Sequence, residues 1–122
     1  MAAKKRHLCC QETVKPVRDA LDVISGKWKL LIVISIAAGN ERFTDIQGSI
    51  PGITPKVLAK QLRELEQDQL IKRTVLSEYP VKILYKTAPY ADTLTPIIHA
   101  LKDWGLYHRE KISERGALGK TE

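Results

Sequence analysis

The sequence predicts a single, mainly helical α+β domain, and three features of the chain support that prediction. Its 122 residues are 43% hydrophobic and 28% charged, which suits one domain that buries a core without disulfides or a metal. Apolar side chains recur at helical spacing along most of the chain. Between two such regions lie two short stretches in which apolar and polar residues alternate, as in strands with one buried face.

The first third of the chain predicts an arm and two helices. Residues 1–13 are polar and basic without periodicity, and we expect them to form a flexible arm. A helical stripe follows the arm and ends at a Ser-Gly pair; it consists of Val14, Val17, Leu21 and Ile24. The second helix begins at Lys27 and is apolar nearly all round, so we expect it to be the central buried helix, with Gly39 as its left-handed stop.

Two capped helices follow in close succession. A capping box with Thr44 as its N-cap predicts a short helix that ends at a Pro-Gly turn. Thr54 is then the N-cap of the next helix, with Pro55 in the first helical position, where its missing N–H costs nothing. This helix extends to about Gln67.

Residues 71–76 and 81–86 alternate in polarity and predict a β-hairpin closed by a Pro-containing loop. The order of elements up to this point is that of a winged helix-turn-helix domain.

The remaining sequence predicts a long final helix. A helical stripe runs from Leu94 to Trp104, and Pro96 is expected to bend the helix or shift its start. We therefore place one winged helix-turn-helix domain with its extra terminal helices over residues 14–112 and a disordered tail over 113–122.

The charge of the chain favours an anionic partner. The net charge is +6, and basic proteins bind nucleic acid more often than an acidic membrane surface. The basic excess lies in residues 1–29 and 54–86, whereas residues 87–122 are neutral overall. A charge of this size is also common in proteins that need it only for solubility, so charge alone does not decide the function.

The helix at 54–67 carries the strongest functional signal. A leucine seam at 58, 62 and 65 lies opposite a row formed by Lys56, Lys60, Arg63 and Gln67. A DNA major groove about 12 Å wide accepts such a helix, whose N-terminal residues reach furthest toward the bases. Any solvated helix shows a similar division, but the position between a short capped helix and a basic hairpin favours DNA recognition.

The predicted DNA contacts fall into three groups. We expect the N-terminal part of the helix at 54–67 to read base edges and the hairpin to contact phosphates or a minor groove. We also expect a backbone clamp before the short helix. The residues are Thr54, Pro55, Lys56, Lys60, Gln61 and Arg63 in the helix, Lys72 and Lys82 in the hairpin, and Arg42 before the short helix.

Several ordered blocks between residues 14 and 108 belong to one recognisable pattern. They are VRDALDVISGKW at 17–28, RFTDI at 42–46, IPGITPKVL at 50–58, QLRELEQD at 61–68, YPVKILY at 79–85 and PIIHALKDWG at 96–105. In these blocks the chain resembles the HxlR-type transcriptional regulators, bacterial winged-helix proteins related to the MarR group. The resemblance implies residues 54–63 as the recognition helix and 71–86 as the wing.

The resemblance also implies a homodimer that pairs through its first and last helices and binds a pseudo-palindromic operator. The neutral charge of the last helix suits an interface that keeps two basic surfaces apart. A role in the core of one domain is the alternative for the same stripe. The predicted interface residues are Leu94, Ile97, Ile98, Leu101 and Trp104.

Cys9 and Cys10 are candidate redox sensors. Many HxlR-type proteins have a Cys-Pro pair just before the first helix, and some sense electrophiles or oxidants through it; here the pair is Lys15-Pro16. The basic residues at positions 4–6 favour thiolates at the two cysteines upstream. Two incidental thiols on an arm are the alternative, and with His7 alone beside them the zinc signal is weak.

These observations predict a DNA-binding homodimeric regulator in the cytoplasm, with no cofactor, no metal and no membrane association. A winged-helix protein–protein adaptor without DNA binding is the alternative, which an acidic or apolar recognition face would indicate. The sequence contains no Gly-rich phosphate loop, nucleophile elbow or His-Glu-x-x-His motif, so an enzyme is not expected. It leaves open whether a small-molecule effector binds, which genes are regulated, and whether the regulator represses or activates.

Overall fold

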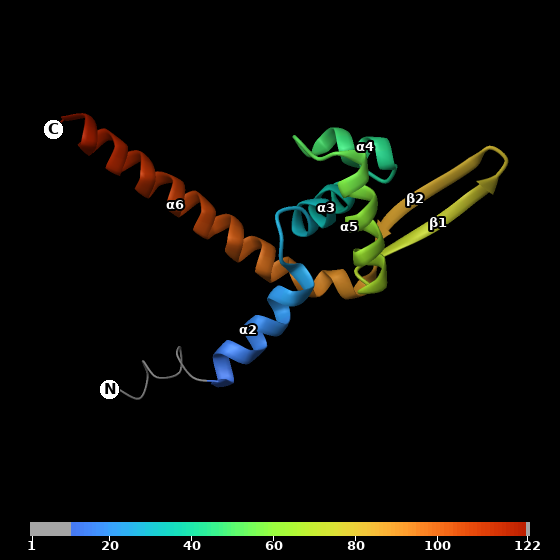
Figure 1. Cartoon of the computed structure of the whole chain (residues 1–122), viewed down its shortest axis with the longest axis horizontal. Helices are drawn as coiled ribbons and strands as arrows, with labels where there is room; N and C mark the ends of the chain where they lie inside the picture. The colour runs from blue at the N-terminus through green and yellow to red at the C-terminus, as the bar shows by residue number, and fades with distance from the viewer. Residues whose placement is uncertain (1–10, 122) are drawn as a thin grey trace.

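The structure is a computed structural model that describes the backbone of residues 11–121 and the side chains of residues 12–77 and 79–115. Figure 1 shows α3, α4 and α5 grouped together, with a two-stranded hairpin projecting to one side and α2 and α6 extending away on the other. The fold is a mainly helical α+β winged helix-turn-helix domain with an extra helix at each end, as predicted. Its elements are α2 (Gln11–Ile24), α3 (Lys29–Ala37), α4 (Phe43–Ser49), α5 (Pro55–Gln67), β1 (Ile71–Glu78), β2 (Val81–Thr87), the 3₁₀ helix η1 (Pro89–Leu94) and α6 (Thr95–Thr121).

The core lies between α3, α4 and α5. α3 lies at the centre of the domain, but its Leu31 and Ile34 side chains are each 42% exposed, so the helix is not buried all round as expected. Trp28 and Phe43 pack against the edge of this cluster. The buried residues that these three helices contribute include Ile32, Ile36, Ile46, Leu58, Leu62 and Leu65.

Glycines fix both ends of α3. Gly26 has a φ of +94° and follows the end of α2, and α3 begins at Lys29, after its N-cap residue Trp28, rather than at Lys27. Gly39 has a φ of +110°, which confirms the predicted left-handed stop just after the helix.

α5 begins and ends at the predicted residues. The backbone N–H of Val57 donates to the Thr54 hydroxyl oxygen at 3.2 Å, and Pro55 lies in the first turn. The sequence therefore places the helix correctly because its cap and its apolar seam agree.

α4 begins two residues before the position that the capping box predicts. Arg42 is the N-cap residue and makes no side-chain cap bond, so the prediction that Thr44 is the N-cap is wrong. The backbone N–H of Tyr85 donates to the carbonyl of Glu41 at 2.8 Å, which fixes the chain beside the hairpin. From there Phe43 packs against the core, and burial of an aromatic ring outweighs a cap worth about 1 kcal/mol.

The hairpin is antiparallel, with Ile71 opposite Thr87 and Glu78 opposite Val81. Its two strands are longer than predicted, and Tyr79-Pro80 alone connects them. A bulge between Val75 and Ser77 interrupts the register near the tip.

Both terminal helices are longer than predicted. α2 begins at Gln11, so residues 11–13 are helical rather than part of the arm. Pro96 lies in the first turn of α6 and shifts its start to Thr95, after η1. α6 then continues through 113–121, where a disordered tail was expected; strong helix formers such as Glu114 and Arg115 support the extension.

Within residues 11–121, none of the helices combines the length and the apolar character that crossing a bilayer demands.

Candidate nucleic-acid interface

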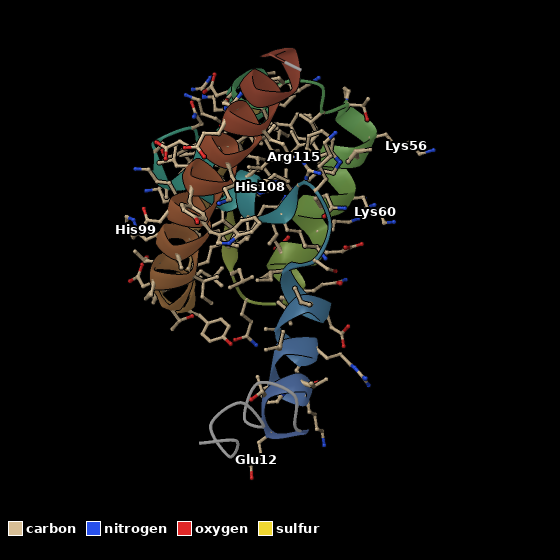
Figure 2. All side chains as sticks on the ribbon, turned by 90° about the vertical axis from the view of Figure 1, so that its left-hand side faces the viewer. Glu12, Lys56, Lys60, His99, His108 and Arg115 are labelled. Atoms are coloured by element: carbon tan, nitrogen blue, oxygen red, sulfur yellow. The ribbon has the colours of Figure 1, made fainter. Side chains whose placement is uncertain are left out.

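α5 presents a row of cations to solvent. Lys56, Lys60 and Arg63 are exposed, and we call these three residues the cationic ridge. The three leucines of the seam on the other side of α5 are buried, so the predicted division of this helix is confirmed. Figure 2 shows Lys56 and Lys60 extending from the same side of α5, away from α6. The ridge is therefore free to contact a macromolecule.

The first turn of α5 is also accessible. Thr54 and Pro55 are exposed, and Gln61 is half-buried at the flank of the helix. Pro55 has no N–H, and the N–H of Val57 donates to the Thr54 hydroxyl oxygen, so contacts at this end of α5 come mainly from its exposed side chains.

The other predicted contact residues surround α5. Arg42 is exposed at the start of α4, Lys72 is exposed at the base of the hairpin, and Lys82 is exposed near its tip, opposite Ser77. The structure thus places every predicted cation of this surface in solvent.

The strand register adds a cation that sequence reasoning did not single out. Lys86 lies directly opposite Lys72, and both side chains are exposed. Like charges in this position destabilise a hairpin, and a bound anion would remove that penalty. The alternating pattern of residues 81–86 includes Lys86, but only the strand register shows that Lys72 is its cross-strand partner.

The tip of the hairpin is unexpectedly apolar. Tyr79 is 97% exposed, and Leu76 and Val81 beside it are also exposed. The sequence did not reveal this feature because it assigns Tyr79 to the loop and Leu76 and Val81 to the two strands, and so does not present them as one surface.

An ion pair holds one acid of α5 away from the ridge. The Lys29 amino group donates to the Glu64 carboxylate, with Nζ and Oε1 2.9 Å apart, and the Lys29 side chain is only 11% exposed. The hydrogen bond from Lys29 lowers the pKa of Glu64, helped by the charges of Lys29, Lys60 and Arg63 and opposed by partial burial. Glu64 therefore remains ionised and engaged with α3.

The lowered pKa predicts a pH-dependent contribution to stability. Ionised Glu64 stabilises the fold above the ordinary glutamate pKa of 4.5, and this contribution is lost as the pH falls through the lower pKa of the folded state. We expect Glu64→Gln to lower the melting temperature at neutral pH, with the difference from wild type narrowing below about pH 4.5. Thermal unfolding followed by circular dichroism across a pH series measures this difference; a constant difference at all pH values would contradict the assignment.

The predicted interface residues of the last helix divide into two groups. Leu94 is buried in the domain core and Ile98 packs against it, so these two residues serve the single domain. Ile97, Leu101 and Trp104 are exposed. An apolar stripe of α2, formed by Val14, Val17 and Leu21, is exposed as well.

Residues 23–113 match the HxlR-like helix-turn-helix family. The chain belongs to this family. Over 107 residues the chain is 38% identical to the HTH-type transcriptional regulator YdeP of Bacillus subtilis. The match covers 88% of this chain and 84% of YdeP.

Solved structures support the same assignment. The redox regulator HypR in its reduced form is 37% identical, with a TM-score of 0.74, and the match covers 81% of this chain and 98% of HypR. A MarR-family transcriptional regulator from Enterococcus faecalis is 31% identical, with a TM-score of 0.69, and the match covers 82% of this chain and 91% of that protein. This HxlR-like protein is therefore a DNA-binding transcriptional regulator of the winged-helix type and not an enzyme.

The structure does not test the predicted redox site. Cys9 and Cys10 lie outside the described residues. Among the residues that the structure does describe, no group of three His, Cys, Asp or Glu side chains is placed to hold a metal ion.

Proposed function

We propose that this HxlR-like protein is a sequence-specific regulator that binds a pseudo-palindromic operator as a homodimer. The observation that carries the proposal is the cationic ridge, exposed along α5 while the opposite seam is buried in the core. An adaptor that binds other proteins would instead use an acidic or apolar face on this helix. The exposed lysines therefore favour DNA.

In the proposed complex, α5 enters the major groove. Thr54, Lys56 and Lys60 lie at its N-terminal end and contact base edges, with Gln61 at the margin. Arg42 contacts the backbone before α4, and Lys72 and Lys82 contact phosphates beside the wing. Base contacts select the sequence, and phosphate contacts provide most of the affinity.

The dimer is proposed to form through α2 and α6. Both helices carry exposed apolar side chains and extend away from the DNA-binding elements (Figure 1). Burial of Leu101 and Trp104 of one protomer against the partner would remove this apolar surface from water. Two α5 helices would then reach successive major grooves about 34 Å apart.

We further propose that oxidants or electrophiles control DNA binding through Cys9 and Cys10. The structural relative HypR is described as a redox regulator. In this chain the two thiols follow Lys4, Lys5 and Arg6, and basic neighbours favour the reactive thiolate.

Selection of bound duplexes from a random pool, with and without mild peroxide, tests both proposals. We expect enrichment of an inverted repeat whose half-sites are about one helical turn apart, or a multiple of it. Peroxide should change the recovered fraction for wild type but not for the variant with Cys9→Ser and Cys10→Ser. No enriched sequence would contradict specific recognition, and an equal peroxide response in the variant would contradict the role of the cysteines.

A further inference from the structure

We propose that the cleft between α5 and the hairpin binds one backbone phosphate of the DNA, held by Arg63 and Arg73. This inference rests on the proposed function. It adds Arg73, which belongs neither to the DNA contacts predicted from the sequence nor to the cationic ridge. It also gives Arg63 a role different from that of the two lysines of the ridge.

The cleft has a charged rim over an apolar floor. It has a volume of about 400 Å³. Arg63 and Glu66 of α5 and Arg73 of β1 form its polar part, and Phe43, Leu62 and Tyr85 contribute apolar surface. Such a space accommodates a phosphate group that approaches from solvent, because both arginine side chains are exposed.

The strand register explains why Arg73 faces the cleft. Ile71 and Arg73 lie on the same face of β1, because side chains two apart in a strand point the same way. Ile71 is buried in the core, so this face is turned toward the helices. Arg73 lies beyond the edge of the core on that face, beside its cross-strand partner Tyr85.

Arg63 reaches the cleft from the other side. It lies seven residues after Lys56 in α5, or about 10 Å further along the helix axis. Lys56 is near the end of α5 that enters the groove, whereas Arg63 is near the hairpin and lines the cleft with Arg73. Position along the helix therefore separates a base-reading end from a phosphate-binding end.

The geometry of duplex DNA brings a phosphate to this place. A helix in the major groove and a wing at the adjacent minor groove are separated by one sugar–phosphate strand, which must pass between them. The cleft lies between the same two elements. Guanidinium groups are suited to this contact because they bind phosphate oxygens through two parallel hydrogen bonds.

Both arginines are available for a ligand. Among the described side chains, neither Arg63 nor Arg73 has a carboxylate oxygen within 4.0 Å of its guanidinium group. The ion pair found there joins Lys29 and Glu64. Glu66 lines the cleft without closing on either guanidinium. Its charge opposes the approach of a phosphate, so Glu66→Gln is expected to strengthen binding to every duplex.

The test compares Arg73→Ala with a matched control, Arg109→Ala. Arg109 is an exposed arginine in the part of α6 that extends away from the hairpin (Figure 1). Affinities of the full chain are measured by fluorescence anisotropy over a salt series, on the selected operator and on a scrambled duplex of the same length. Lys60→Ala serves as the reference for loss of a ridge contact.

We expect Arg73→Ala to weaken both duplexes about tenfold or more, because a charge-assisted phosphate contact is lost in each protomer. The slope of log affinity against log salt should decrease in magnitude by about two per dimer. The ratio of the two affinities should stay unchanged, since a phosphate carries no sequence information. Arg109→Ala should match wild type.

If Lys60→Ala weakens binding but Arg73→Ala keeps the wild-type affinity and slope, the cleft assignment is overturned and the proposed function stands. If wild type shows no salt-dependent DNA binding, both are overturned. A methylphosphonate scan with the wild-type protein covers the case in which Arg73→Ala does not fold. Neutralising a phosphate between the contacted grooves should weaken binding, and no effect at any of these phosphates would overturn the inference.

Discussion

Raising the salt concentration from 50 to 200 mM is expected to weaken operator binding by about 10³–10⁵-fold. The reason is counterion release: a dimer whose lysines and arginines neutralise about 6–10 phosphates displaces that many condensed cations. The contributing side chains in each protomer are exposed and include Arg42, Arg63, Lys72 and Lys82. Fluorescence anisotropy at several salt concentrations gives the slope of log affinity against log salt, expected between about −5 and −9.

The like-charged pair across the hairpin, Lys72 and Lys86, is expected to contribute to this salt dependence. Lys72 and Lys86 repel each other in the free protein, and a bound phosphate relieves the repulsion. Replacing Lys86 with Ala should therefore reduce the slope. Affinity that does not change over this salt range would contradict a phosphate-binding surface on α5 and the wing.

Replacing Leu101 with Glu is expected to separate the dimer and to weaken operator binding by about 10²–10⁴-fold, because each half-site is then bound independently. Leu101 is 51% exposed in the single chain and lies in the stripe of α6 that includes Trp104. A carboxylate there has to be buried unpaired if the dimer forms. Sedimentation velocity measures the oligomeric state, and anisotropy measures the affinity for the operator.

α6 offers a matched control for that variant. Leu106 is 56% exposed, and its position in the helix places it more than a quarter turn away from Leu101, outside the stripe. Leu106→Glu should remain dimeric and bind the operator as wild type does. If Leu101→Glu remains dimeric at the same concentrations, the interface through this stripe is wrong.

The sequence predicted α5 well because independent local signals agree there. Thr54 and Pro55 fix its start, and the buried leucines occur at the spacing of one helical face. α4 was misplaced because a backbone contact between Tyr85 and Glu41, far apart in the chain, decides where it begins. Local capping chemistry carries no information about such a contact.

At the C-terminal end of the chain, the sequence predicted too little helix. α6 continues through residues 113–121 in spite of two glycines, 116 and 119, whose sequence signal favours a tail. The stripe of α6 was visible in the sequence, but its division was not. Leu94 belongs to the core of its own domain, whereas Leu101 is exposed and is not part of that core.

The candidate site was predictable where one helix carries it and less so where two elements meet. The cationic ridge follows from spacing within α5. Arg73 and Lys86 gain their meaning only from the register of the hairpin and from its position beside α5. Sequence patterns do not report a distance between elements that pack in space.

The central claim, that the N-terminal end of α5 reads bases, is tested most directly by comparing Lys56→Ala with Lys82→Ala on the selected operator and a scrambled duplex. The account predicts that Lys56→Ala reduces the ratio of the two affinities by about tenfold or more, since a base contact is worth about 1–3 kcal/mol of discrimination. Lys82→Ala should weaken both duplexes alike and leave the ratio unchanged. An unchanged ratio for Lys56→Ala, with both duplexes bound equally less tightly, would contradict base recognition by this end of the helix.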